Sequence, residues 1–273
     1  MKYRGLTIVP IGGLANRMRV VMSVLKYADE QSVPVRIIWT SSKECKVFWG
    51  ELFQPLLHNK VQIHDGSFKE SVATKHNLWL PKLLRWGEYD KQIDDFNPNK
   101  QSLKELGKKY GSLYISTCYA IGEYDPTMVG KVFVPLPALQ EKVAETTKKF
   151  TPHTLGVHIR RKDNKQAILH SPLSAFRQRM DAYIALYDDA RIFLCTDDLS
   201  VKRHFLQLYK DRLLINEVEL QRQTCSGMLD AVVDLWCLAK TTMVTGSYFS
   251  SFSDTATEIG GQPLEIIDVG DRI

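Results

Sequence analysis

Residues 154–164 read Thr-Leu-Gly-Val-His-Ile-Arg-Arg-Lys-Asp-Asn, an apolar run that passes straight into charged side chains. Leu155, Val157 and Ile159 occupy alternate positions, which is the period-2 pattern of a β-strand. The strand ends where three cations and one carboxylate arrive together. In open α/β sheets ligands bind beyond the carboxyl ends of the strands, and arginine can grip phosphate oxygens bidentately. The pattern favours a diphosphate site, although charged residues also commonly mark the exit of a strand into solvent.

The overall composition is typical of a soluble globular protein, with 273 residues, 44% hydrophobic and 25% charged. The net charge of +5 comes from 36 basic residues dispersed among 31 acidic ones, which favours an anionic small molecule over nucleic acid. No apolar run is long enough for a transmembrane helix, so no stable membrane insertion is expected. Five scattered cysteines without a C-x-x-C pair indicate reduced thiols in the cytoplasm and argue against a zinc site.

The chain after residue 150 alternates strands and helices. Strands are expected at 191–196, 213–216, 242–245 and 264–267, and helices at 171–187, 199–208, 228–240 and 253–259. This alternation predicts a parallel, doubly wound sheet with its ligand at the strand C-termini. Pro152 punctuates the chain, so we expect an N-terminal α/β domain at 1–150 and a C-terminal α/β domain at 151–273.

The N-terminal half opens with a second phosphate-binding layout. A strand at 6–11 is followed by Gly12, Gly13 and a helix whose first turn contains Asn16 and Arg17. Two glycines allow close approach of a ligand, and free N–H groups at a helix start favour anions. A tight turn between strand and helix explains the same residues equally well.

Other strands of this half are expected at 35–39, 61–64 and 112–119, with a helix or turn at 44–57 and a helix after Pro137. Residues 66–99 lack clear periodicity and carry several aromatic residues among charges. Such a segment is either a binding loop, which could take an acceptor, or an insertion whose aromatics fill the core.

Three further groups of polar residues stand out in the second half. Asp197 and Asp198 follow a buried strand; one can cap the next helix, and the other can accept hydrogen bonds from a ribose or a base. Asp234 lies among apolar helix residues and needs a partner, for which a nucleobase would serve. Ser250 and Ser251 stand between a strand and a helix, where they form either an anion cradle or a simple capping loop.

Four segments, taken in order, resemble the donor domain of the fucosyltransferase superfamily, the α1,6-, α1,2- and protein O-fucosyltransferases. They are His158-Ile-Arg160-Arg161-x-Asp163, Leu-Cys-Thr-Asp197-Asp198, Asp234-Leu-Trp-Cys-Leu-Ala, and Ser250-Ser251. Residues 12–17 also resemble the glycine-rich first loop of that group. The resemblance implies a GT-B-like α/β fold of two Rossmann-type domains, with the second binding the nucleotide sugar. It also implies inverting transfer of fucose from GDP-fucose to a hydroxyl of a glycan or similar acceptor, without a metal or other cofactor.

The resemblance also implies a role for each matching residue. Arg160 would contact the β-phosphate and stabilise the departing diphosphate, with Arg161 and Asp163 as the scaffold that orients it, since neighbouring strand residues point to opposite faces. The other implied contacts are with the donor: His158 and Asp234 with guanine, Asp197 or Asp198 with the ribose or base surroundings, and Ser250 or Ser251 with a phosphate, helped by the backbone of Gly13.

Departures from the family pattern keep alternatives open. Lys162 and Asn164 stand where α1,6-type members place threonine and lysine, and no glutamate follows Asp163 as a base. The general base would then have to be His170, an unaligned Asp or Glu, or the substrate itself. A non-catalytic nucleotide- or sugar-phosphate-binding protein of the same fold is therefore the alternative, and a nucleic-acid-binding module is disfavoured by the even charge distribution. The acceptor and the oligomeric state cannot be read from the residues.

Overall fold

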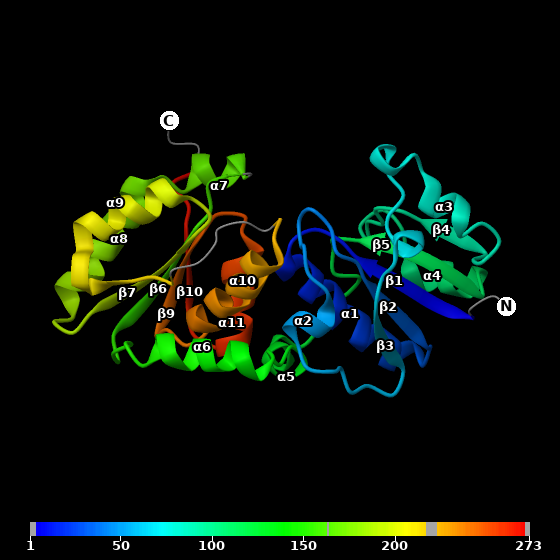
Figure 1. Cartoon of the computed structure of the whole chain (residues 1–273), viewed down its shortest axis with the longest axis horizontal. Coiled ribbons are helices and arrows are strands. Elements are labelled where there is room, and N and C mark those ends of the chain that lie inside the picture. The colour runs from blue at the N-terminus through cyan, green and yellow to red at the C-terminus, as the bar shows by residue number, and fades with distance from the viewer. Residues whose placement is uncertain (1–3, 163, 217–222, 271–273) are drawn as a thin grey trace. The chain divides into compact units, whose positions relative to one another are not determined.

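The computed structural model describes residues 4–162, 164–216 and 223–270 (Figure 1). The chain forms two α/β units, Met1–Asp125 with Lys131–Val134, and Pro126–Gly130 with Pro135–Ile273. It therefore passes between the units at residues 126–135, before the predicted boundary at residue 150. The physical reason is that helix α6 (Pro137–Thr147) packs against helix α10 (Cys225–Leu238) of the second unit.

The first unit is built on a parallel sheet with the strand order β3-β2-β1-β5-β4. Its strands are β1 (Gly5–Pro10), β2 (Val35–Trp39), β3 (Val61–Asp65), β4 (Lys91–Ile93) and β5 (Ser112–Thr117). Its helices are α1 (Leu14–Gln31), α2 (Trp49–Leu52), α3 (Leu80–Leu84) and α4 (Leu103–Lys109), with 3-10 turns η1 (Phe68–Glu70) and η2 (Lys75–Asn77). All four strands predicted for this half are present.

The segment predicted to be irregular, 66–99, contains only short elements: η1, η2, α3 and β4. The helix or turn predicted at 44–57 is reduced to the four residues of α2, which pack through Trp49 against Trp39, Phe53 and Phe133. Helix α4, which had not been predicted, is capped by the Ser102 side chain accepting from the Glu105 N–H.

The second unit contains five parallel strands in the order β10-β9-β6-β7-β8. They are β6 (Thr154–Ile159), β7 (Arg191–Thr196), β8 (Leu213–Leu214), β9 (Met243–Ser247) and β10 (Leu264–Ile267). Besides α6 and α10, the remaining elements are η3 (Pro126–Met128), α5 (Val129–Val132), α7 (Lys165–His170), α8 (Leu173–Leu186), α9 (Leu199–Tyr209), η4 (Lys210–Arg212) and α11 (Ser251–Gly260). Residues 129–130 of α5 belong to this unit and its last two to the first.

The predicted doubly wound sheet is confirmed. Renumbered from β6, the strand order is 5-4-1-2-3, so the direction of winding reverses between β6 and β9. In open α/β sheets the ligand crevice lies outside the carboxyl ends of the strands at this reversal. The stretch that begins at Arg160 and the loop between β9 and α11 both leave the sheet there.

The two faces of the second sheet are covered by different helices, as Figure 1 shows for α8 and α9 against α6, α10 and α11. Leu155, Val157 and Ile159 of β6 are fully buried in a core with Phe176 of α8 and Phe205 of α9. On the other face, Gly156 of β6 lies against α10 and His158 against Phe252 of α11. There Gly156 is required for close packing, because a Cβ would lie 2.6 Å from the Thr241 hydroxyl oxygen.

Two findings concern membrane-spanning helices and disulfides. No helix of the described chain is both long and apolar enough to cross a membrane. The five cysteines are all free thiols in the structure, as their spacing had predicted.

Candidate functional site

Arg160 is the first residue beyond β6, at the carboxyl edge of the second sheet. Its Nε lies 3.2 Å from Oδ2 of Asp197, which follows β7, and the two side chains are 11% and 16% exposed. The same carboxylate accepts from the backbone N–H groups of Arg161, at 2.8 Å, and of Lys162. Asp197 therefore fixes both the guanidinium plane and the turn that carries it.

Ser247, the last residue of β9, holds the other side of the Arg160 turn. Its Oγ accepts from the Arg160 N–H at 2.9 Å and donates to the carbonyl of His158 at 3.3 Å. Three neighbouring strands, β7, β6 and β9, are thus joined by hydrogen bonds at one edge. A guanidinium set in such a network is preorganised for an anion.

His158 lies beneath this turn, 5% exposed, with its ring 4.8 Å from that of Phe252. Burial, followed by the charge of Arg160, lowers its pKa to about 3, so the imidazole is neutral at pH 7. Its Nδ1 is 3.3 Å from Oγ of Ser250. A neutral ring of this kind offers one donor and one acceptor, which suits a base edge; the predicted guanine contact stays a prediction.

The loop from β9 into α11 brings Ser250 and Ser251 to the same edge. Ser250 is the N-cap of α11 and makes no side-chain capping bond, and Ser251 is the first helical residue. The preceding Phe249 is 78% exposed and has a φ of 54°, a left-handed conformation that is costly for a non-glycine residue. Asn164 supports this loop by donating from Nδ2 to the Phe249 carbonyl at 2.9 Å.

The Arg161 side chain forms hydrogen bonds to the backbone within the second unit. Its NH2 donates to the Ser171 carbonyl at 2.6 Å, and its NH1 lies 3.4 Å from the Ala167 carbonyl at the end of α7. Helix α7 itself, which the residues had not predicted, is capped by Oδ1 of Asn164 accepting from the Ala167 N–H. These bonds agree with the scaffold role inferred for Arg161 and take its guanidinium away from direct donor contact.

Asp163, predicted to orient Arg160 together with Arg161, lies outside the described residues. Asp198 takes the simpler of its two predicted roles: it caps α9, accepting from the N–H groups of Ser200 and Val201. The hydrogen bond from the Ser200 hydroxyl, followed by those backbone bonds, lowers the pKa of Asp198. Of the two adjacent carboxylates, Asp197 is therefore the one that reaches the Arg160 network.

Asp234 is held in a separate network within the second unit. Its Oδ1 accepts from Nδ2 of Asn216 at 2.7 Å, and Asn216 in turn accepts from Thr146 of α6 and, through its carbonyl, from Lys202 of α9. A buried carboxylate needs a hydrogen-bond donor, and for Asp234 this donor is the side-chain amide of Asn216. Burial raises the pKa of Asp234 to about 6.

We expect the variant Asp234→Asn to change how stability depends on pH. The folded carboxyl group has a pKa above its ordinary 3.8, so the stability it confers is fully present below pH 3.8 and is lost as pH rises through about 6. The asparagine cannot ionise, so between pH 4 and pH 7 the variant should gain on the order of 2 kcal/mol in unfolding free energy relative to wild type. Urea unfolding at several pH values measures this difference. A difference that stays flat across the range would show that Asp234 titrates normally.

Gly12, Gly13, Asn16 and Arg17 lie in the first unit. Gly12 has a φ of 82°, which favours glycine, and Gly13 is the N-cap of α1 without a side-chain capping bond. Asn16 lies beside Gly12, with its Nδ2 3.4 Å from where a Cβ of Gly12 would be. The layout of strand, glycines and helix is as predicted; its contact with a donor stays a prediction.

Arg17 corrects the interpretation of that first turn. Its side chain is fully buried and donates to the Gly12 carbonyl at 2.9 Å, the Thr40 carbonyl at 2.6 Å and the Ser42 hydroxyl at 2.9 Å. Burial lowers its pKa. The guanidinium therefore holds the glycine loop in shape and is not placed to bind a donor directly.

Two residues of the site were missed by sequence reasoning, Ser247 and Asn164. Ser247 belongs to the small hydroxyl stretch 246–253 that had been noticed, but its bonds join residues 87 and 89 positions apart. Asn164 was noted only as a departure from the family pattern. Neither role has a local signal.

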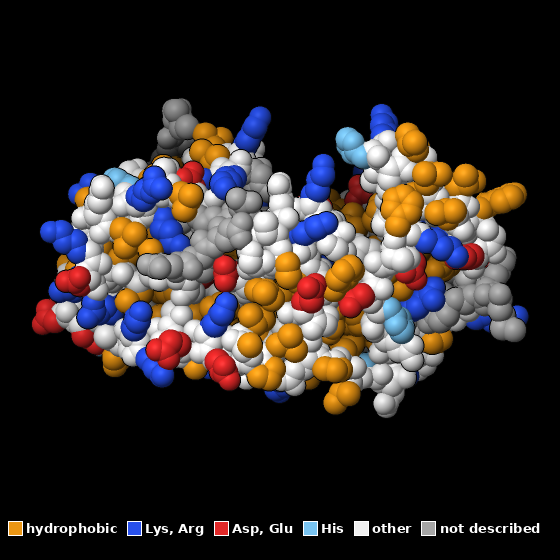
Figure 2. All heavy atoms as spheres, viewed as in Figure 1, with side chains coloured by type: hydrophobic (Ala, Val, Ile, Leu, Met, Phe, Trp, Pro, Cys, Tyr) orange, Lys and Arg blue, Asp and Glu red, His pale blue; other side chains and the backbone are white. Residues whose placement is uncertain are grey.

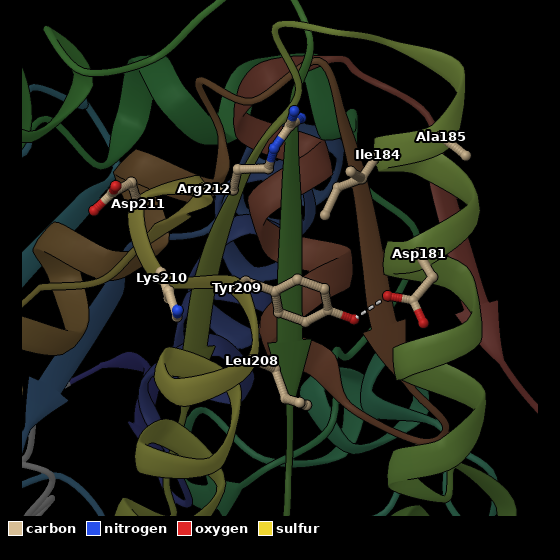
Figure 3. Close-up of a pocket in the computed structure, with 8 residues that line it drawn as sticks. All are labelled: Asp181, Ile184, Ala185, Leu208, Tyr209, Lys210, Asp211 and Arg212. Carbon is tan, nitrogen blue, oxygen red and sulfur yellow. Dashed lines mark hydrogen bonds between the residues drawn. The ribbon is translucent and has the colours of Figure 1, made fainter.

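A surface hollow elsewhere in the second unit is not part of this edge (Figure 3). It lies between the last turns of α8 and α9, where the strands begin, and the Tyr209 hydroxyl donates across it to Asp181 at 2.7 Å. Among the residues the structure describes, no group of three or more His, Cys, Asp or Glu side chains is arranged to hold a metal ion.

This architecture is also found in known proteins. No family model and no curated protein matches the sequence. Among solved structures, NodZ α-1,6-fucosyltransferase soaked with GDP-fucose matches with a TM-score of 0.64 at 17% identity, over 96% of this chain and 95% of that one. The fold is that of the fucosyltransferases. The shared fold agrees with the resemblance inferred from the motifs, and at 17% identity the match concerns the fold alone.

Two further fucosyltransferase structures share the fold. Arabidopsis thaliana FUT1, a mutant in complex with GDP, matches with a TM-score of 0.61 at 13% identity, over 97% of this chain and 70% of that one. POFUT1 in complex with GDP matches with a TM-score of 0.60 at 11% identity, over 98% and 99% of the two chains. The predicted class, a GT-B-like α/β fold of two parallel sheets flanked by helices, is thus confirmed.

Proposed function

We propose that this protein is an inverting, metal-independent glycosyltransferase that moves fucose from GDP-fucose to a hydroxyl of a glycan or similar acceptor. The fold is shared with fucosyltransferases solved with GDP or GDP-fucose. The observation that carries the proposal is the placement of Arg160, which Asp197 and Ser247 hold at the winding reversal of a doubly wound sheet. We further propose that the first unit takes the acceptor and that the protein works in the cytoplasm.

The chemistry requires a cation at this position. As the bond between fucose C1 and the β-phosphate oxygen breaks, negative charge grows on the diphosphate and oxocarbenium-like positive charge on the sugar. A guanidinium carries five N–H donors, enough to keep Asp197 and bind a phosphate at once. The N-terminus of α11, with Ser250 and Ser251, adds aligned N–H groups for the same charge.

Inversion follows if the acceptor oxygen attacks C1 from the side opposite the leaving diphosphate. Fixing the diphosphate holds C1 in register for this in-line attack. The neutral His158 ring supports recognition of the base, and we propose that Asp234 contributes to the same recognition. The base that takes the acceptor proton stays unassigned; His170 is paired with Asp268 through Nδ1 at 3.0 Å.

The proposal is tested by calorimetric titration of the full chain with GDP, GDP-fucose and UDP, each in EDTA. We expect micromolar binding of both guanine nucleotides, at least tenfold weaker binding of UDP, and no loss on chelation. Equal affinity for UDP would contradict the proposed recognition of guanine by His158. Loss of binding in EDTA would contradict metal independence.

The alternative is a non-catalytic protein of the same fold that binds a nucleotide or sugar phosphate, and the missing general base favours it. Release of GDP from GDP-fucose, measured over a panel of glycan acceptors, separates the two functions. Binding of GDP-fucose without acceptor-dependent release of GDP would support the alternative.

A further inference from the structure

An apolar surface on the first unit is not explained by fucosyl transfer. Six residues form it, and we call them the 78–86 patch: Leu78, Trp79, Leu80, Leu83, Leu84 and Trp86. All six are exposed, Trp86 by 84%, Leu78 by 76% and Leu83 by 66%. Figure 2 shows hydrophobic side chains gathered over α3. Contiguous exposed apolar surface of this kind marks an interaction site more often than a random surface does.

The patch stands on a rigid base. Arg85, in its middle, is fully buried and donates through NH1 to the carbonyls of Lys69 and Ser71, both at 2.6 Å. Its guanidinium also lies 3.9 Å from the ring centre of Tyr114 in β5, and the Tyr114 hydroxyl donates to the Glu70 carbonyl. The segment is thus tied to the sheet, and the exposed leucines and tryptophans are held outward.

The backbone turn at the tip presents two of these side chains. Leu78 and Trp79 have φ values of 54° and 60°, left-handed conformations that cost free energy in non-glycine residues. A chain that only needed a turn here would more cheaply use glycine or asparagine. The large apolar side chains therefore point to a surface that uses them.

Within the segment that forms the patch every charged residue is basic, and Glu88, which follows it, is paired with Lys69. Between Lys75 and Trp86 the chain has no Asp or Glu, whereas Lys75, His76 and Lys82 are exposed at its edge. Figure 2 shows basic side chains at the rim of this apolar region. Tryptophan and leucine with flanking lysine is the composition of segments that lie in a membrane interface.

We propose that the 78–86 patch docks the protein peripherally on the surface of an anionic lipid membrane. The tryptophans and leucines would enter the headgroup region, with Lys75 and Lys82 against the lipid phosphates. A second copy of the chain is a poorer occupant, because a two-fold contact would bring like charges together. The segment is far too short to span a bilayer, so this association is distinct from membrane insertion.

Vesicle flotation of the full chain tests the proposal in the absence of any nucleotide. We expect binding to vesicles of phosphatidylcholine mixed with phosphatidylglycerol, reduced severalfold by added salt or on phosphatidylcholine alone. The variant Leu83→Ser, Leu84→Ser, Trp86→Ser should bind at least about tenfold more weakly. Its control, Leu57→Ser with Leu186→Ser, removes two leucines elsewhere that are at least as exposed as Leu83 and Leu84, and should bind as wild type does.

The charged rim is tested in the same assay. Lys75→Glu with Lys82→Glu should weaken binding to the mixed vesicles by at least about thirtyfold, since each basic residue near an anionic surface contributes about 1 kcal/mol and both charges are reversed. The control is Lys104→Glu with Lys108→Glu, which makes the same charge change on α4. These side chains are all exposed, so folding is preserved, and circular dichroism verifies it.

Tryptophan emission identifies the inserted residues. Vesicles should shift wild-type emission to the blue, and Trp79→Phe with Trp86→Phe should still bind but lose the shift. Absence of binding by the wild type, or undiminished binding by the serine variant, would overturn the proposal. A wild-type dimer in analytical ultracentrifugation that the serine variant abolishes would assign the patch to a second copy instead. All these results are independent of fucosyl transfer.

Discussion

The Arg160→Ala variant should lower kcat for fucosyl transfer by about 10²- to 10³-fold, because a preorganised donor to developing charge is removed. The protein should remain folded, since the side chain lies beyond the strand, and its affinity for GDP should fall as well. Steady-state release of GDP from GDP-fucose in the presence of an acceptor measures the effect. Arg177→Ala, which removes an exposed arginine of α8, is the matched control and should leave kcat unchanged.

Asp197 is expected to affect catalysis by orienting Arg160. A double substitution can test this directly. Asp197→Asn should lower kcat by roughly 10- to 100-fold in the wild-type background, since misplacing the guanidinium by an ångström has effects of that size. In the Arg160→Ala background the same change should have little further effect. Full additivity of the two substitutions would mean that Asp197 contacts the donor directly. No loss on removing Arg160 would refute the proposed leaving-group site.

The Arg17→Met variant should destabilise the first unit by about 2–5 kcal/mol. The change leaves the carbonyls of Gly12 and Thr40 buried without their donor, and each unsatisfied group costs about 1–3 kcal/mol. Urea unfolding followed by tryptophan fluorescence measures it, because four of the five tryptophans lie in the first unit: Trp39, Trp49, Trp79 and Trp86.

Lys26→Met is the control for this stability prediction, because Lys26 lies on the same helix and forms an exposed pair with Glu30. It should change stability by no more than about 0.5 kcal/mol. If Arg17→Met were equally mild while GDP binding was lost, Arg17 would be a ligand-binding residue after all, as its position in the first turn had suggested.

The peripheral membrane docking proposed for the 78–86 patch would concentrate the protein at a lipid surface without any spanning helix. The residues of the surrounding segment, 66–99, predicted an irregular region that is either a binding loop or an insertion whose aromatics fill the core. The structure buries Phe96 and Tyr89 but leaves Trp79 and Trp86 exposed. Aromatic residues without periodicity carry no local signal of which side of the surface they occupy.

The residues alone were sufficient to predict the strands of the second sheet and the motifs at its edge. Alternating apolar residues in 154–159 and the apolar run 191–196 are local signals of buried strands, and strand–helix alternation restricts the topology to a few parallel arrangements. The ordered motifs then indicated the fucosyltransferase fold, which the solved structures share. Arg160 was placed at a strand end on the same grounds.

The roles of the individual charged residues became evident from their hydrogen-bond partners in the tertiary structure. Arg17 and Arg160 both lie in stretches that the sequence favours for phosphate binding. In the structure Arg17 is buried and donates to backbone carbonyls, whereas Arg160 pairs with Asp197 at the sheet edge. Asp198 caps a helix, while Asp234 finds Asn216 across the fold. The physical reason is that hydrogen-bond partners far apart in the chain are chosen by packing, which leaves no periodic trace in the residues themselves.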